Sequence, residues 1–272
     1  MKSKHLSLEA IALLGVCSLA WMNAQAAGFA VRVSPPRFEL TGDPGETIRG
    51  VVQIGNADTE TGRYVVRTAD WDLDDQGNVF IHPPELRPDS CRPWSRIERR
   101  KLTIGPGGTK KYRFEVRVPN DTAPRECRFA ILISPAPESE ALGGIGDVQI
   151  PVAGQIAVVV YVAVGGAQPT LEVQKITVDD VQGRRLPVAL IHNSGNAHGR
   201  PEGLLEGRDA RGQLLDFTVS PSPILPGRTR SISIWPSSPE NAQESPEFAF
   251  PVRIEGPIEW EGGSYDVDVE LR

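Results

Sequence analysis

Residues 150–164 read IPVAGQIAVVVYVAV, an apolar run in a chain of 272 residues whose mean hydropathy is −0.25. The run is shorter than the ~20 residues of a membrane-spanning helix, and its β-branched residues favour a strand. At ~3.3 Å per residue it would extend roughly 50 Å, far beyond an ordinary strand. Apart from Gly154, every second position from 148 to 164 carries a bulky residue: Val148, Ile150, Val152, Ile156, Val158, Val160, Val162 and Val164. We therefore expect one long strand with a bulky face and a small or polar face.

The two halves of this strand have different expected roles. Pro151 has no amide hydrogen for a central ladder, so we expect 148–152 to lie at a sheet edge and Gly154 to bend the strand. Residues 156–164 are expected to fill the core of their own domain. An apolar face on an edge strand that follows the loop APESEALGGIGD (136–147) also suits pairing with another molecule.

Strand signals recur along the chain after residue 26, whereas helical spacing of apolar residues is nearly absent. The 27 glycines and 24 prolines separate the short apolar runs as turn residues. Many short strands without interleaved helices predict an all-β chain built of sandwiches.

A weak internal repeat predicts two sandwiches. One strand ends in Asn56 and another in Asn193, and each is followed by a Pro-Gly turn (106–107 and 226–227) and a further strand. Convergent turn chemistry would produce the same similarity. With the boundary placed in GGAQP (165–169), the domains are 27–166, with 17 basic and 18 acidic residues, and 167–272, with 10 and 16.

The first 26 residues have the pattern of a cleavable signal peptide. Lys2 and Lys4 precede an apolar stretch over 10–21, which is followed by the small-x-small sequence at 24–26. An uncleaved anchor and a lipoprotein are the alternatives, but the stretch is short for a span and Val16 precedes Cys17 where lipidation needs a small residue. The pattern predicts export, here to the periplasm.

The exported chain is acidic and has two cysteines. Loss of the leader changes the net charge from −6 to −7, which argues against nucleic acid as a partner. Cys91 and Cys127 remain, and in an oxidising compartment such a pair predicts a disulfide. Two reduced, buried thiols are the alternative.

The order of these features resembles the PapD-like family, the periplasmic chaperones of the chaperone-usher pilus pathway. The matching stretches are VSPPRFEL, TIRGVVQIGNADTETGRYVVRTADW, LTIGPGGTKKYRFEV and RFAILISPAP, and, more loosely, LPVALIHNSGN and ILPGRTRSI. The resemblance implies two immunoglobulin-like sandwiches set at an angle around a basic-lined cleft. It also implies the activity: a long strand is lent to a pilin or fimbrial subunit that lacks its own last strand, and the complex goes to an outer-membrane usher.

The resemblance assigns roles to particular residues. The lent side chains would be Val148, Ile150 and Val152. The family fixes the subunit's C-terminal carboxylate with two basic residues, and the arginine matches Arg37 in SPPRFEL. The lysine does not match, because the simplest alignment places Val158 there. Arg32 could serve instead, the anchor could be altered, or the client could be something other than a pilin. Without the family, Arg37 reads as a surface arginine beside Glu39.

No other group of residues in the sequence predicts a metal site or a catalytic site. DWDLDDQGN (70–78) has acids at calcium-loop spacing, but Pro83 stands where a bidentate glutamate is needed, so we expect a hairpin turn. His192 and His198 flank a turn without further ligands nearby, and Trp71, Trp94 and Tyr112 are expected to pack. No catalytic motif, cofactor or small-molecule substrate is indicated, so we expect no enzyme. The rival function is a two-domain envelope scaffold or adhesion module.

Overall fold

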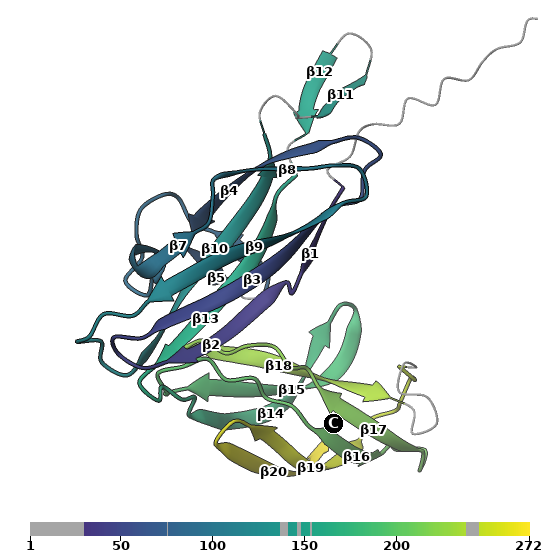
Figure 1. The fold of residues 1–272 in the computed structure, drawn as a ribbon. Coiled ribbons are helices and arrows are strands. Elements are labelled where there is room, and N and C mark those ends of the chain that lie inside the picture. Colours follow the sequence, from purple (N-terminus) through teal and green to yellow (C-terminus); the bar gives the residue numbers. More distant parts are fainter. Residues whose placement is uncertain (1–29, 75, 137–140, 146–147, 153, 238–244) are drawn as a thin grey trace, which may run out of the picture.

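The structure is a computed structural model that describes residues 30–272 except 75, 137–140, 146–147, 153 and 238–244, with the backbone alone for 141–145 and 148–152. Apart from one short 3-10 helix, η1 (Arg92–Trp94), every regular element in this part is a strand. The strands build two immunoglobulin-like sandwiches set at an angle (Figure 1), which confirms the expected fold class. No helix among these residues is long and apolar enough to cross a membrane. The predicted signal peptide lies outside the described residues.

The first sandwich packs a four-stranded sheet on a five-stranded one. The sheet orders are β1(Val31–Ser34)-β3(Thr47–Asn56)-β9(Thr109–Arg117)-β7(Ser95–Ile97) and β2(Arg37–Gly42)-β13(Ile156–Val164)-β10(Arg125–Pro135)-β4(Gly62–Ala69)-β8(Lys101–Ile104). Alternate residues of each strand fill the core between the sheets, as the period of two requires. From β13 these are Val158, Val160, Val162 and Val164, all fully buried.

The apolar run is divided between two strands, so the prediction of one long strand is wrong. Residues 156–164 form β13 inside the sheet, as expected. β12 (Val148–Val152) instead leaves that sheet and pairs antiparallel with β11 (Ala141–Ile145), forming a separate two-stranded ribbon beyond the end of the sandwich (Figure 1). The break falls around Gly154, where the sequence already suggested a bend.

β13 is only partly covered on its outer side. β2 pairs with it in parallel from Val159, opposite Arg37, to Val164, opposite Gly42. The chain enters β2 from the other sheet through Pro35 and Pro36, so β2 begins only at Arg37. Among the described residues, 156–158 of β13 therefore have no neighbouring strand on that side.

The second sandwich is a single seven-stranded sheet folded around its own core. Its order is β14(Leu171–Val181)-β15(Arg184–Asn193)-β18(Thr229–Ser237)-β17(Leu214–Val219)-β16(Leu204–Arg208)-β19(Val252–Trp260)-β20(Gly263–Leu271). β14 and β20, at opposite ends of the order, come into contact because the sheet curls. Leu205, Phe217 and Ile254 are fully buried between its two halves.

The internal repeat corresponds to one buried structure that occurs in both domains. Asn56 is fully buried, and its Nδ2 donates to the carbonyl oxygens of Glu60 at 2.6 Å and Ile104 at 3.2 Å. Asn193 is equally buried, and its Nδ2 donates to the carbonyl four residues later at 2.8 Å and to that of Ile224 at 2.8 Å. In each domain the asparagine thus fastens its own turn to the residue two positions before the Pro-Gly turn.

Two smaller expectations are also confirmed. Cys91, beside η1, and Cys127, in β10, are joined by a disulfide with Cα atoms 5.4 Å apart. The aromatic trio packs as expected, since Trp71 and Tyr112 are buried and Trp94 lies against the first core.

The acidic stretch at 70–78 forms a hairpin of β5 (Trp71–Leu73) and β6 (Val79–Ile81). Asp74 closes its turn by accepting the Asn78 amide at 2.7 Å; Asp75 lies outside the described residues. No cluster of three or more His, Cys, Asp or Glu side chains suited to a metal ion occurs in the described part of the chain.

Candidate functional site

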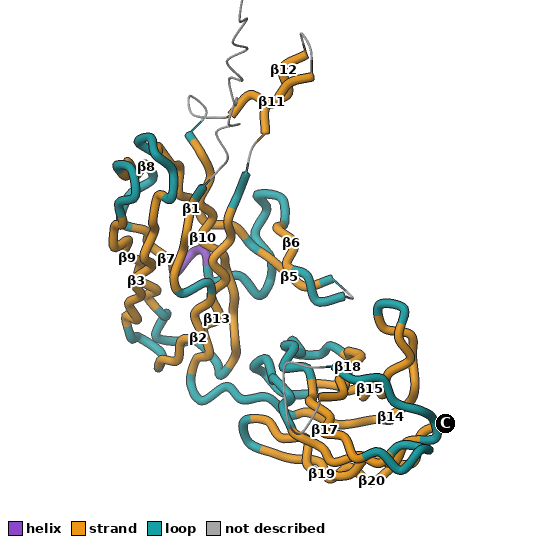
Figure 2. The backbone as a smooth tube through the Cα atoms, turned by 90° about the vertical axis from the view of Figure 1, so that its right-hand side faces the viewer, coloured by secondary structure: helices purple, strands orange, loops and turns teal. Residues whose placement is uncertain are grey.

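The five-stranded sheet of the first domain turns its outer face toward the second domain (Figure 2). We call the junction of the two domains the elbow; there Glu39, Glu126 and Tyr161 of the first domain lie beside His198 and Arg200 of the second. On β2, Phe38 and Leu40 pack against the core, so Arg37 and Glu39 point to the outer face. In the ladders Glu39 is opposite Tyr161 of β13, and Tyr161 is opposite Arg128 of β10. The elbow is therefore faced by one row of side chains from three strands.

An apolar cluster joins the two domains beside this row. Trp71 and Tyr161 meet edge-to-face with ring centroids 5.0 Å apart, and Trp71 Nε1 donates to the Phe129 carbonyl at 2.9 Å. Leu225 reaches into the cluster from the second domain and is only 3% exposed. Burial of these side chains from water stabilises contact between the domains.

Three basic side chains converge on one oxygen of Glu39. Its Oε1 lies 2.8 Å from Arg37 Nε, 3.0 Å from Arg200 Nε and 3.4 Å from His198 Nε2. Arg37 comes from the same strand, whereas Arg200 and His198 belong to the second domain. The hydrogen bond to His198, with the charges of His198, Arg200 and Arg37, lowers the pKa of Glu39 to about 2 against the effect of burial.

The other nitrogen of His198 meets a second carboxylate of the first domain. His198 Nδ1 is 2.5 Å from Glu126 Oε2, and the His198 amide donates to the same oxygen at 3.2 Å. The side chains of His198 and Glu126 are 10% and 1% exposed, and the imidazole stacks on Tyr161 at 4.0 Å. Burial by itself would lower the pKa of His198, but the hydrogen bonds to Glu126 and Glu39 outweigh it and raise that pKa.

Arg37 is the one predicted anchor residue that the structure places on the elbow face. It begins β2 at the point where the uncovered edge of β13 ends, and its side chain is 47% exposed. Its ion pair with Glu39 is the contact expected of a surface arginine beside that residue.

The alignment that places Val158 at the position of the family's lysine is wrong, and so is the suggestion that Arg32 replaces that lysine. Val158 is fully buried in the first core, so the position does not face the cleft, and the neighbours that do are Ala157 and Val159. Arg32 lies on β1, in the four-stranded sheet on the far side of the sandwich. Neither residue can stand beside Arg37.

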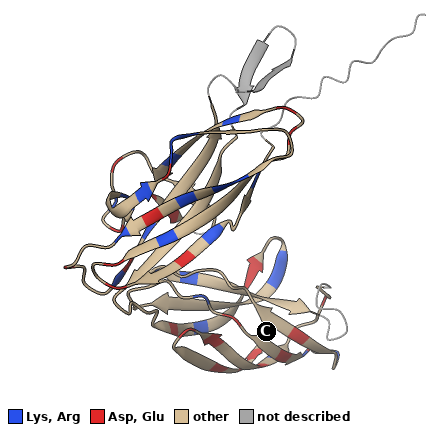
Figure 3. Cartoon of the chain, viewed as in Figure 1, with Lys and Arg blue, Asp and Glu red and all other residues tan. Residues whose placement is uncertain are grey.

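The expected basic lining of the cleft is also wrong. The hollow at the elbow, about 300 Å³, is lined by two basic side chains, His198 and Arg200, and by four acidic ones: Glu39, Glu126, Glu202 and Glu261. Figure 3 shows that bands of Lys and Arg cross β3 and β9 instead. These belong to the four-stranded sheet, which faces away from the elbow.

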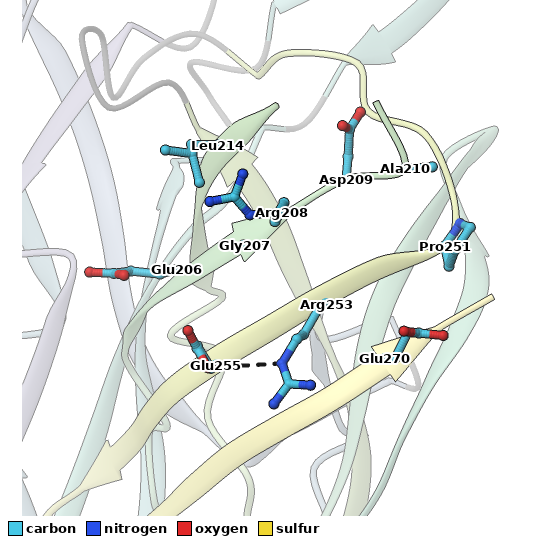
Figure 4. A pocket seen from close by; sticks show the side chains of 10 residues that line it. All are labelled: Glu206, Gly207, Arg208, Asp209, Ala210, Leu214, Pro251, Arg253, Glu255 and Glu270. Carbon is cyan, nitrogen blue, oxygen red and sulfur yellow. Dashed lines mark ion pairs between the residues drawn. The ribbon is translucent and has the colours of Figure 1, made fainter. Parts of the chain in front are cut away.

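A second open hollow of about 410 Å³ lies on the second domain (Figure 4). Of its charged side chains, Arg253 lies 4.0 Å from Glu255 and 2.6 Å from Asp268, and Asp209 lies 3.2 Å from Arg211. None of the residues predicted as a site lines this hollow.

The assigned donor residues Val148, Ile150 and Val152 all lie in β12 and, by alternation, share one face of it. Their role in binding stays a prediction. His198, Arg200, Glu126 and Glu39 were not predicted as a site, because they come from distant strands and no local spacing links them.

No protein-family model and no curated protein match this chain. The fold is similar to that of fimbrial chaperones. The YadV chaperone is 11% identical, with 89% of this chain and 100% of that chain covered and a TM-score of 0.46. A chaperone–tip adhesion subunit complex, CsuC–CsuE of Acinetobacter baumannii, is 10% identical with 89% and 97% covered and a TM-score of 0.43. The E. coli chaperone DraB is 12% identical with 90% and 97% covered and a TM-score of 0.43.

Proposed function

We propose that this protein is a periplasmic chaperone that binds exported fimbrial subunits by strand addition and passes them to an outer-membrane usher. The observation that carries the proposal is the place of Arg37 at the end of the uncovered edge of β13. An extended client segment paired with residues 156–158 would end beside this guanidinium, which is suited to a terminal carboxylate. No cofactor or reaction is needed.

β12 would extend this surface beyond the sandwich. Val148, Ile150 and Val152 would enter the groove that the client's missing strand leaves open. To do so, β12 would use its free edge or exchange its pairing with β11 for pairing with the client. Main-chain pairing and burial of alternate side chains would then cover a client edge that otherwise aggregates.

A client carboxylate would compete with Glu39 for binding to Arg37. A client carboxylate would share or replace the ion pair between Arg37 and Glu39. With a charge-assisted bond to the carboxylate, Arg37→Ala should weaken client capture by about 1.5–3 kcal/mol. Unchanged affinity would leave Arg37 a surface residue paired with Glu39.

The first experiment is purification of the tagged mature protein from its native periplasm, with mass spectrometry of whatever stays bound. A stoichiometric small secreted subunit would support the chaperone. Recovery of the protein alone, despite co-expression with neighbouring secreted proteins, would favour the envelope scaffold or adhesion module.

The captured subunit then allows a test of strand addition. Ile150→Asp and Val152→Asp should abolish protection of the subunit from aggregation, because a charge cannot enter an apolar groove. Leu214→Asp is the matched control, since Leu214 is 62% exposed on the second domain. Protection by both β12 variants, with folding unchanged by circular dichroism, would refute the assignment of the lent strand.

A further inference from the structure

His198 has a carboxylate oxygen at each ring nitrogen. Nδ1 lies 2.5 Å from Glu126 Oε2 and Nε2 lies 3.4 Å from Glu39 Oε1. A neutral imidazole has only one N–H, so it can donate to only one carboxylate, whereas the imidazolium donates to both. Carboxylate oxygens beside both ring nitrogens therefore favour the imidazolium over the neutral ring.

The two carboxylates belong to one domain and the histidine to the other. Glu39 is on β2 and Glu126 on β10, whereas His198 lies in the loop after β15. The shorter contact, supported by the His198 amide, fixes Nδ1 to the buried Glu126. Loss of a proton would therefore come from Nε2, and its lone pair would then face Glu39.

The groups around His198 make its contact with Glu39 sensitive to the charge of the imidazole. Among the described residues, Glu126 Oε1 has no hydrogen-bond partner, so the buried carboxylate depends on His198 for its counter-charge. The titratable and charged groups around the imidazole come from every element at the elbow: Arg37 and Glu39 of β2, Glu126 and Arg128 of β10, Tyr161 of β13, and Arg200, Glu202 and Glu261 of the second domain. The acids lining the hollow favour the imidazolium as well.

We propose that His198 is a proton-operated contact that couples the two domains: protonated, it adds its own contact to Glu39 of the first domain beside that of Arg200, and on losing the Nε2 proton it withdraws that contact. The pKa of His198 is raised above its usual 6.5, so the contact is lost on the alkaline side of that value. The apolar contact of Leu225 remains in both states, as do the ion pairs of Arg228 with Asp72 at 3.4 Å and of Arg200 with Glu39 at 3.0 Å. The bond between His198 Nδ1 and Glu126 remains as well. The domains therefore stay joined while the elbow becomes less restrained.

The loss of this contact also changes the surroundings of Arg37. With His198 neutral, Glu39 keeps only Arg37 and Arg200 as partners, and it then competes more strongly for Arg37. Under the proposed function, client capture would weaken in the same pH range, as linkage between the two sites requires. The experiment below uses the free protein, so its result does not depend on a client.

The test combines nuclear magnetic resonance with a distance measurement. The ¹⁵N shifts of His198 should show both nitrogens protonated at low pH and loss of the proton from Nε2 alone, with a midpoint above 6.5. Spin labels on cysteines replacing the exposed Lys110 and Leu214 report the distance between domains by electron–electron resonance from pH 5.5 to 9. The distance distribution should broaden with the same midpoint.

Three variants complete the design. His198→Gln should give the broad distribution at every pH. Glu39→Gln should give a distribution that no longer changes with pH, because an amide can accept from the imidazolium or donate to the neutral ring. His192→Gln is the control and should behave as wild type, since His192 bonds Thr229 within its own domain.

A wild-type distribution that stays constant while His198 titrates would overturn the proposal, as would loss of the proton from Nδ1. The wild-type protein alone decides this if a variant does not fold.

Discussion

Asn193 is expected to carry more stability than any exposed polar residue of the second domain. Asn193→Ala would leave the Ala197 carbonyl without its donor and the Gly195 amide without its acceptor, while the Ile224 carbonyl would keep the Gly199 amide as a donor. Each unsatisfied buried group costs about 1–3 kcal/mol, so we expect the free energy of unfolding to fall by about 2–4 kcal/mol. Urea denaturation measures this change. Asn120→Ala, at an exposed position, is the control and should change little; a similar small change for Asn193→Ala would contradict the structural role.

Single residues were predictable where their role is local. The two asparagines end strands and precede turns in the same order in both domains, so the internal repeat alone indicates a shared role for them. His198 gave no such signal, because its partners are brought to it by the packing of two domains. The error at Val158 was avoidable, since the alternation that buries Val160 and Val162 buries Val158 too.

At the scale of elements, the disulfide between η1 and β10 gives a direct prediction. It closes a loop over a sequence separation of 36 residues, and both cysteines are fully buried. Replacement of Cys91 and Cys127 together by alanine should lower stability by about 2–4 kcal/mol, chiefly because the unfolded chain regains freedom. Differential scanning calorimetry of the double variant measures the effect. An unchanged melting temperature would mean that the core holds β10 without the bridge.

The strands themselves were largely predictable, but their pairing was not. Runs such as KKYRFEVRV and RFAILI mark β9 and β10 by composition and turn residues alone. The departure of β12 from the sheet depends on which strand it pairs with, and its partner β11 lies in the stretch expected to be a loop. The same holds for β2, whose late start at Arg37 determines how much of β13 is uncovered. Which strands pair, and where the pairing begins, depends on contacts between elements that are distant in the chain. The local sequence therefore does not predict it.

At the scale of the whole molecule, each sandwich has its own hydrophobic core, and a third cluster joins the two domains at the elbow. The strength of the contacts at the elbow therefore determines whether the two domains unfold together. The internal repeat predicted two domains and the family resemblance implied an angle between them, but neither predicted the charges at the elbow. Basic residues were expected there by resemblance, whereas the hollow is lined by four acids and two basic groups. This balance makes the junction depend on which of its groups hold protons.

Glu39 gives the acid-side prediction for this junction. Its pKa is lowered from 4.5 to about 2, chiefly by the hydrogen bond to His198, so its contribution is complete above pH 4.5 and is lost as pH falls toward 2. Because the side chain is 42% exposed, solvent screening keeps the effect to about 1 kcal/mol or less. Thermal melts from pH 5 to 2 should therefore fall less steeply for Glu39→Gln than for wild type. Glu255→Gln, an exposed acid of the second domain, is the control and should follow the wild-type curve. Parallel curves for Glu39→Gln and wild type would mean that the three basic groups around Glu39 add nothing to the coupling of the domains.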